Sequence, residues 1–197
     1  MKKGNWKNWL SNWSRWLHIY LSMFSFVIVL FFSITGLTLN HLDWFPEKEI
    51  LKEQKGQLNP IWVNVADTSQ IKKLEIVEHF RNQYAVKGLI NDFRIDENEV
   101  SISFQGPGYT ADAFIQREDG KFQLSTRELG WVAFFNDLHK GRDTGKSWSW
   151  VIDFSAIFMT IISLTGLILL LFLKKKRFNG IIWLILGLGA VGLLYYL

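Results

Sequence analysis

Cysteine is absent from this chain of 197 residues. Its absence excludes disulfide bonds, thiolate metal sites and covalently attached haem. The chain also lacks the Gly-x-Ser-x-Gly, His-Glu-x-x-His, P-loop and dinucleotide-binding motifs of common enzyme classes. Any part that lies outside a membrane must therefore fold without disulfides, and the sequence offers no familiar catalytic or nucleotide site.

Charge is missing from three long apolar stretches. Residues 19–39 and 178–197 contain no Asp, Glu, Lys or Arg, and residues 151–173 contain only Asp153. At about 1.5 Å rise per residue, a helix of this length crosses a hydrocarbon core of about 30 Å. The first stretch is too long for a signal-peptide core, and no small-x-small cleavage signal follows it. The sequence therefore predicts a membrane protein with three transmembrane helices, over residues 17–40, 148–173 and 178–197.

Positive charge gathers at the cytoplasmic ends of membrane helices. Residues 1–16 contain four basic residues and no acid, and residues 174–177 read KKKR. Both segments are therefore predicted to face the cytoplasm. The membrane is predicted to be a bacterial inner membrane, and its lipid bilayer is the expected partner of the three spans. Residues 41–147 are then extracytoplasmic, and their 14 basic and 17 acidic residues give no reason to expect nucleic-acid binding.

Trp6, Trp9, Trp13 and Trp16 recur at spacings of three, four and three residues, which places them on one face of a helix. Lys7 and Arg15 are interleaved with them. The pattern predicts an amphipathic segment that lies at the inner membrane interface before the chain turns into the first span.

The outer segment, 41–147, has the pattern of a small α+β domain. Asp67 and Gln70 resemble a capping box, and apolar residues then recur at helical spacing up to Gly88. Short alternating runs follow, separated by the turn sequences DENE, GPG and REDG. We expect one helix on an antiparallel sheet of about four strands, roughly over residues 61–127, with residues 48–60 as a mobile connection.

The first and second predicted spans share a Thr-Gly motif, in SITGLTL (33–39) and SLTGLIL (163–169), which favours close helix packing. With the flanking RWLHIYLSMFSF (15–26) and LHKGRDTGKSWSWVIDF (138–154), these stretches resemble the PepSY-associated transmembrane family. The chain is shorter than the larger members, which have more spans and more histidines. The residues that match the family pattern are Arg15, His18, Gly36, Leu138, His139, Gly141, Arg142, Asp153, Thr165 and Gly166.

The resemblance implies two different functions. Some large members look like inner-membrane reductases that hold haem b between histidines and pass electrons to iron chelates outside. PepSY modules elsewhere bind or inhibit secreted peptidases. The outer segment of this chain resembles a PepSY module in its pattern of elements.

The histidines decide how a haem could be held. His18 and His41 lie at opposite ends of the first span, about 35 Å apart along a helix, so they cannot share one iron. His41 and His139 both lie just outside the membrane, and glycines such as Gly141 would let the chain bend so that the two face each other. We predict them as a candidate axial pair, with Arg142, Lys140 and Lys146 near the propionates and apolar walls formed by Trp44, Phe45, Trp131, Phe134, Phe135 and Trp148.

A simpler interpretation stays open, in which His139 donates to a backbone carbonyl and His41 is an interfacial residue. His18 would need a second subunit, such as a homodimer, to complete a haem site. His79 is expected to be solvated. Asp153 is the one acid within a span, and we expect it to contact Arg142 and fix the turn on the helix.

Two hypotheses follow. The first is a haem-b-binding electron-transfer component of ferric-reductase type, at most a subunit of a membrane oxidoreductase, which receives electrons from quinol or a membrane redox partner. The second is a membrane-anchored module, without enzymatic activity, that binds or inhibits a secreted or membrane protein such as a peptidase.

Overall fold

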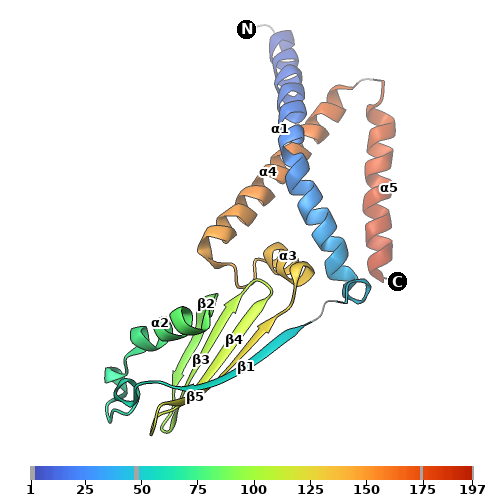
Figure 1. The fold of residues 1–197 in the computed structure, drawn as a ribbon. Coiled ribbons are helices and arrows are strands. Elements are labelled where there is room, and N and C mark those ends of the chain that lie inside the picture. Colours follow the sequence, from blue (N-terminus) through green and yellow to red (C-terminus); the bar gives the residue numbers. More distant parts are fainter. Residues whose placement is uncertain (1–2, 47–48, 174, 197) are drawn as a thin grey trace. The chain divides into compact units, whose positions relative to one another are not determined.

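The computed structural model describes residues 3–46, 49–173 and 175–196 (Figure 1). The chain divides into two compact units. One unit contains Met1–Phe31 and Asp153–Leu197, and the other contains Phe32–Ile152.

Three helices in the described part of the chain are long and apolar enough to cross a membrane. They are α1 (Lys3–Asn40), α4 (Gly145–Phe172) and α5 (Arg177–Tyr196). Most of their large apolar side chains are exposed on the chain itself, as expected of side chains that face lipid. The predictions of a membrane protein and of three such helices are confirmed.

Helix α1 is continuous from Lys3 to Asn40, so the turn predicted after Trp16 is wrong. The ring centroids of successive tryptophans from Trp6 to Trp16 lie 5.3 to 5.9 Å apart, and Tyr20 extends the row at 5.1 Å from Trp16. Contacts between side chains three and four residues apart stabilise a helix. The tryptophan row therefore supports the helix across the point where a turn was expected.

The α+β domain lies in the second unit and contains one antiparallel sheet with the strand order β1-β5-β4-β3-β2 (Figure 1). Strands β2 to β5 form a meander in which each strand pairs with the next. The strands are β1 (Ile50–Gln57), β2 (Leu89–Ile95), β3 (Glu99–Gly106), β4 (Tyr109–Gln116) and β5 (Lys121–Glu128).

The sheet has five strands, and not the four predicted, because β1 was assigned to the mobile connection 48–60. Its sequence, ILKEQKGQ, is largely polar, and seven of its eight residues are exposed. It therefore lacks the apolar alternation that marks a half-buried strand. Backbone pairing along β5, from Ile50 opposite Glu128 to Gln57 opposite Lys121, holds it in the sheet.

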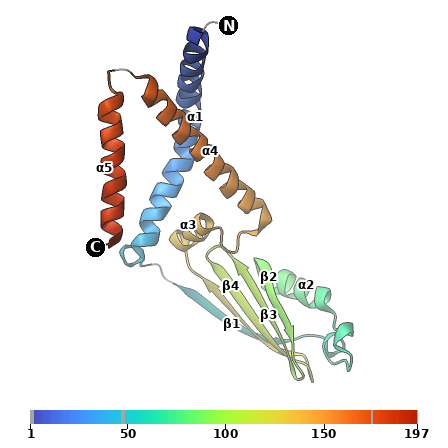
Figure 2. The ribbon, with the colours of Figure 1, turned by 180° about the vertical axis from the view of Figure 1, so that it is seen from behind.

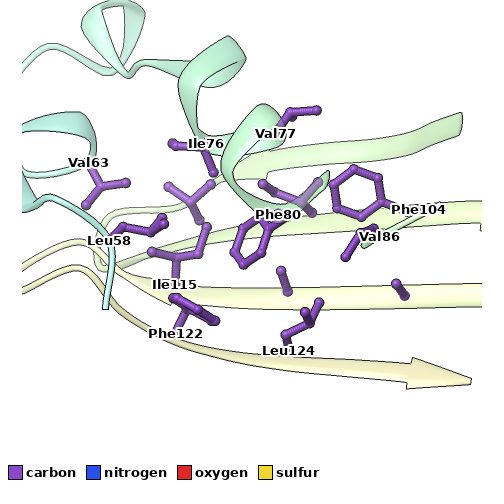
Figure 3. Packing of buried hydrophobic residues seen from close by; sticks show 14 of the residues in the cluster. Leu58, Val63, Ile76, Val77, Phe80, Val86, Phe104, Ile115, Phe122 and Leu124 are labelled. Atoms are coloured by element: carbon purple, nitrogen blue, oxygen red, sulfur yellow. The ribbon is translucent and has the colours of Figure 1, made fainter. Parts of the chain in front are cut away.

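Helix α2 (Lys73–Tyr84) packs on one face of the sheet (Figure 3). Phe80 is fully buried, and its ring meets Phe122 of β5 edge to face at 4.9 Å. Small residues in β4, Ala111 and Ala113, are also fully buried and leave room for the helix. The larger members of the core include Leu58, Val63, Ile76, Val77, Val100, Ile102, Phe104, Ile115 and Leu124.

The start of α2 differs from the prediction. Asp67 accepts a hydrogen bond from Ser69 N at 2.9 Å, but the element that it caps is the 3-10 turn Thr68–Gln70. This hydrogen bond lowers the pKa of the Asp67 carboxyl. Helix α2 begins five residues later, after Lys72, and ends at Tyr84 with Ala85 in the left-handed conformation.

His79 is half-buried, so the expectation that it is solvated is wrong. Its ring lies 5.8 to 6.3 Å from those of Trp62, Phe80, Tyr84 and Phe122. Its Nε2 atom is buried and has no hydrogen-bond partner among the described residues. Its neighbour Glu78 suggested a polar face, but the aromatic side chains of β5 and the preceding turn cover the histidine.

Replacing Phe80 by Ala should lower the free energy of unfolding of the α+β domain by about 3–5 kcal/mol, because the change opens a cavity in the core. Urea unfolding of the full chain in detergent, followed by tryptophan fluorescence, measures the change. Leu74→Ala on the same helix is the control, because Leu74 is 71% exposed and should cost under about 1 kcal/mol. Equal losses in the two variants would contradict this packing.

Candidate functional site

Helix α3 (Trp131–Lys140) carries the predicted histidine His139 in its last turn. Gly141 ends the helix with a φ of +69°, and its N–H donates to the carbonyl of Leu138 at 3.2 Å. This is a left-handed C-cap, a position that favours glycine. The role of Gly141 is therefore to stop α3 directly after His139 and Lys140.

Asp137 is a buried carboxylate, with a side chain that is 7% exposed. Its Oδ1 accepts from Arg142 Nη2 at 2.7 Å, and its Oδ2 accepts from the backbone N–H of Gly108 at 2.9 Å. Lys140 Nζ lies 3.8 Å from the same carboxylate. A buried charge needs such partners to offset its loss of hydration. Asp137 thus joins α3, the turn that follows it and the hairpin between β3 and β4.

The β3–β4 hairpin lies against the first turn of α3, as both views show (Figures 1 and 2). A Cβ atom added at Gly108 would lie 3.0 Å from the backbone nitrogen of Phe134, and the φ of Gly108 is +62°. Leu129 N donates to Gly108 O at 2.9 Å. Burial raises the pKa of the adjacent Tyr109 phenol above its ordinary value. A side chain at position 108 would push the hairpin away from α3.

Two polar residues of α3 contact the last two turns of α1. Thr38 donates to Asn136 Oδ1 at 2.7 Å, and His139 Nδ1 lies 2.6 Å from Thr35 Oγ1. The His139 ring also meets Phe32 edge to face, at 5.0 Å between centroids. Asn136 and His139 stand three residues apart on α3 and contact threonines three residues apart on α1. These contacts fix the imidazole of His139 against the first Thr-Gly motif.

A second histidine is held in the same way in the other unit. His18 Nδ1 on α1 lies 3.4 Å from Thr165 Oγ1 on α4. The hydroxyl of Thr165 donates to Ile162 O at 2.8 Å, so it accepts from the Nδ1 proton of His18. A Cβ atom at Gly166 would lie 3.0 Å from His18 Cε1. Glycine at this position therefore makes room for the imidazole.

The two Thr-Gly motifs thus share one structural role that their sequence alone did not reveal. Each presents a threonine hydroxyl to the Nδ1 atom of a histidine from another helix, and each places its glycine beside the Cε1 atom. In both histidines the Nε2 atom has no hydrogen-bond partner among the described residues. Both imidazoles are therefore oriented through their Nδ1 atoms.

His41 lies just past the end of α1 and stacks on Trp44, with 3.8 Å between centroids and 8° between planes. Its Nε2 atom lies 3.4 Å from the amide nitrogen of Asn40. No hydrogen bond or ring contact in the described structure joins His41 to His139. The two imidazoles are held separately, and their pairing on one iron stays a prediction.

The remaining predicted residues have separate positions. Arg142 binds Asp137 and also lies 3.8 Å from Asp143, while its side chain remains 60% exposed. Arg15 and Asp153 are exposed on α1 and α4. The contact between Asp153 and Arg142 stays a prediction.

Asn136 and Asp137 of this site were missed from the sequence. In the sequence, Asn136 and Asp137 interrupt the apolar run from Trp131 to Leu138. Two adjacent polar residues in such a run were the available signal. Asn136 is 2% exposed, and its Nδ2 atom has no partner among the described residues. Trp148, expected as an apolar wall, also donates from Nε1 to Leu138 O at 2.8 Å.

Replacing Asp137 by Asn should weaken the contact between the hairpin and α3 by about 2 kcal/mol, because the charge-assisted bond to Arg142 is lost. Hydrogen exchange at the backbone amides of Gly106 and Gly108 should then be about 30-fold faster. Asp143→Asn is the control, because that carboxylate lies 3.8 Å from Arg142 and contacts it more weakly. Unchanged exchange in Asp137→Asn would show that the carboxylate does not hold the hairpin.

Comparison with known proteins gives a family match. The family model described as PepSY_TM-like matches residues 12–197, a range that includes His18, His139 and both Thr-Gly motifs. No curated protein and no solved structure matches the chain. Because the match covers nearly the whole sequence, the chain belongs to the PepSY_TM-like family.

Proposed function

We propose that this protein is a haem-b-binding electron-transfer component of a bacterial inner membrane, of ferric-reductase type. The observation that carries the proposal is the state of His139. Its Nδ1 atom is engaged by Thr35 at 2.6 Å, while Nε2 has no partner among the described residues. Imidazoles that bind metals through one nitrogen are commonly oriented by a hydrogen bond at the other.

The tautomer that suits an iron ligand is available at His139. Thr35 Oγ1 lies 3.5 Å from Phe32 O, to which it can donate its own proton. Nδ1–H of His139 then donates to Thr35, and Nε2 keeps its lone pair. At His18, where Thr165 donates to Ile162 O, the same proton placement follows from the shorter distance of 2.8 Å.

His41 is the proposed second ligand. Its stack on Trp44 orients the ring, and its Nε2 atom accepts at most a long contact from Asn40 at 3.4 Å. Lys140, at the end of α3, and Arg142, whose side chain is 60% exposed, offer cations for the propionates. Imidazoles and nearby cations are the residue types that hold a haem, which when bound would supply one-electron iron chemistry. The chain itself would orient the imidazoles and balance the propionate charge.

The same proposal places the α+β domain outside the membrane, on the side opposite the basic segments 1–16 and 174–177. Electrons would come from quinol or from a membrane redox partner, since the chain has no nucleotide-binding motif. The acceptor would be an iron chelate at the outer surface.

The visible spectrum of the purified protein tests this function. After expression with ample haem and extraction in mild detergent, dithionite should produce the sharp absorption bands of a reduced b-type haem. His139→Ala and His41→Ala should each remove at least about nine-tenths of the haem, and His79→Ala is the matched control because His79 lies in the α+β core. A colourless wild-type protein would refute the redox function, and a full spectrum in His139→Ala would refute the ligand.

Thr35→Val separates a positioning role from a structural one. Without the hydroxyl, Nδ1 of His139 loses its acceptor, so the haem midpoint potential should shift while the fold is retained. Thr160→Val is the control, because the one bond of Thr160 among the described residues is to the carbonyl of Ala156 on its own helix. A potential unchanged in Thr35→Val would show that Thr35 does not tune a ligand.

A second function, partner binding, is favoured by a groove in the α+β domain. The groove lies between α2 and the edge strand β2 and has a volume of about 410 Å³. Leu74 and Ile90 are 71% and 44% exposed, and such an edge can accept an extended peptide. The residues that line the groove are Lys73, Leu74, Val77, Glu78, Arg81, Ile90 and Phe93.

Cross-linking of the tagged full chain in its native membranes tests this alternative. A defined partner protein should be recovered with the wild type and lost with Leu74→Glu/Ile90→Glu. Glu53→Lys/Lys55→Glu on the opposite edge strand β1 is the control. Recovery that is equal in both double variants would exclude the groove as the binding site.

A further inference from the structure

Helix α1 carries an exposed apolar row at alternating spacings of three and four residues. We call it the α1 seam. Alternating spacing of this kind is the heptad pattern of coiled coils, and it is sustained here for more than three heptads. The seam residues are 48–76% exposed, and they are Trp6, Trp9, Trp13, Trp16, Tyr20, Met23, Val27 and Leu30.

The opposite face of α1 is already used by α4. Ser14 and Ser25 are only 3% and 4% exposed, and His18 lies against Gly166. Phe24, which flanks the seam, meets Phe158 of α4 at 5.2 Å between centroids. In heptad terms, with Trp6 and Trp13 at a, His18 and Ser25 occupy f, the position farthest from the seam. The chain thus covers one side of α1 with its own helix and leaves the seam open.

A lipid interface alone does not account for the tryptophans of the seam. Trp6 and Trp16 are ten residues apart on a continuous helix, which is about 15 Å. The headgroup layer on each side of a bilayer is about 6 Å thick. Even a helix tilted by about 40° would spread the four rings over about 11 Å. At least two tryptophans therefore lie beyond the layer that usually holds this residue.

We propose that the α1 seam is a homodimer interface, in which α1 of a second copy packs in parallel and in register. Two copies inserted in the same way in one membrane necessarily present α1 in the same direction. Between Trp6 and Leu30 the seam contains no charged residue, whereas Lys7 and Arg15 occupy the outer b and c positions. Identical helices can therefore meet along the seam without bringing like charges together.

The area available matches a specific dimer. A tryptophan buries roughly 150–250 Å² when it is fully covered, and about half of each seam ring is exposed. The four tryptophans and Tyr20 of two copies therefore have on the order of 1,000 Å² to bury, which is near the lower bound for a specific interface. Met23, Val27 and Leu30 extend this contact into the apolar span.

The interface is independent of the proposed haem function. Because His18 occupies the f position, dimerisation through the seam keeps the two His18 imidazoles on opposite outer faces. A dimer of this kind does not complete a haem site with two copies of His18. A homodimer that pairs two His18 imidazoles on one haem and a homodimer that packs through the α1 seam therefore exclude each other.

Cysteine cross-linking tests the seam directly, because the natural chain has no cysteine and each variant carries only one thiol. Trp6→Cys, Trp9→Cys, Trp13→Cys and Trp16→Cys are oxidised in native membranes, and the covalent dimer is followed by gel electrophoresis. Asn8→Cys and Arg15→Cys are the matched controls, since both residues are exposed but occupy c. We expect disulfide formation at least about ten times faster at the seam positions than at the controls.

Equal rates at the two sets of positions, or no disulfide at any seam position, would overturn the proposal. Co-purification of two differently tagged copies provides a second measurement that requires no cysteine. Trp9→Ala/Trp13→Ala should reduce it at least about fivefold, whereas Asn8→Ala/Arg15→Ala should not. Failure of the wild-type copies to co-purify from mild detergent after cross-linking in the membrane would also overturn it.

Discussion

The buried carboxylate of Asp137 connects three segments that are distant in the sequence. It binds the hairpin at Gly108 and the turn at Arg142 from a position in α3. Its neighbours Asn136 and His139 reach Thr38 and Thr35 at the end of α1. The position of His139 therefore depends on an ion pair that lies outside the apolar span. Removing a partner from a buried charge is strongly destabilising, so the contacts of Asp137 tolerate little change.

The apolar architecture could be predicted from the sequence because its signals are local. Length and lack of charge identified three helices, and their bounds agree with the structure to within about three residues for α4 and α5. Alternation identified β3, β4 and β5, which bury every second residue. Strand β1 was not predicted, because its residues are largely polar and lack apolar alternation. Backbone pairing with β5 holds it in the sheet, and this pairing has no local signal in the sequence. The spacing of the tryptophans predicts a helix, but the same spacing is compatible with a short separate helix before the span. It therefore could not show that α1 continues past Trp16.

The candidate site was predicted in part. His139, Gly141 and Arg142 were recognised from one motif, and Thr35 and Thr165 from another, but their mutual contacts were not. No periodicity shows that the histidine of one motif lies against the Thr-Gly of the other. The two motifs together explain why each histidine is accompanied by a threonine acceptor and by a glycine. They also give His18 an intramolecular partner, although no second histidine accompanies it.

The connection between β5 and α3 is short, since β5 ends at Glu128 and α3 begins at Trp131. Leu129 within it is hydrogen-bonded to Gly108, so the hairpin and both ends of the connection are tied together. A change in the twist of the sheet is therefore expected to displace the His139 imidazole. Under the proposed function, thermodynamic linkage would make this coupling reciprocal: a partner that binds the sheet and alters its twist would change the affinity for haem at His139, and haem would change the affinity for that partner by the same factor.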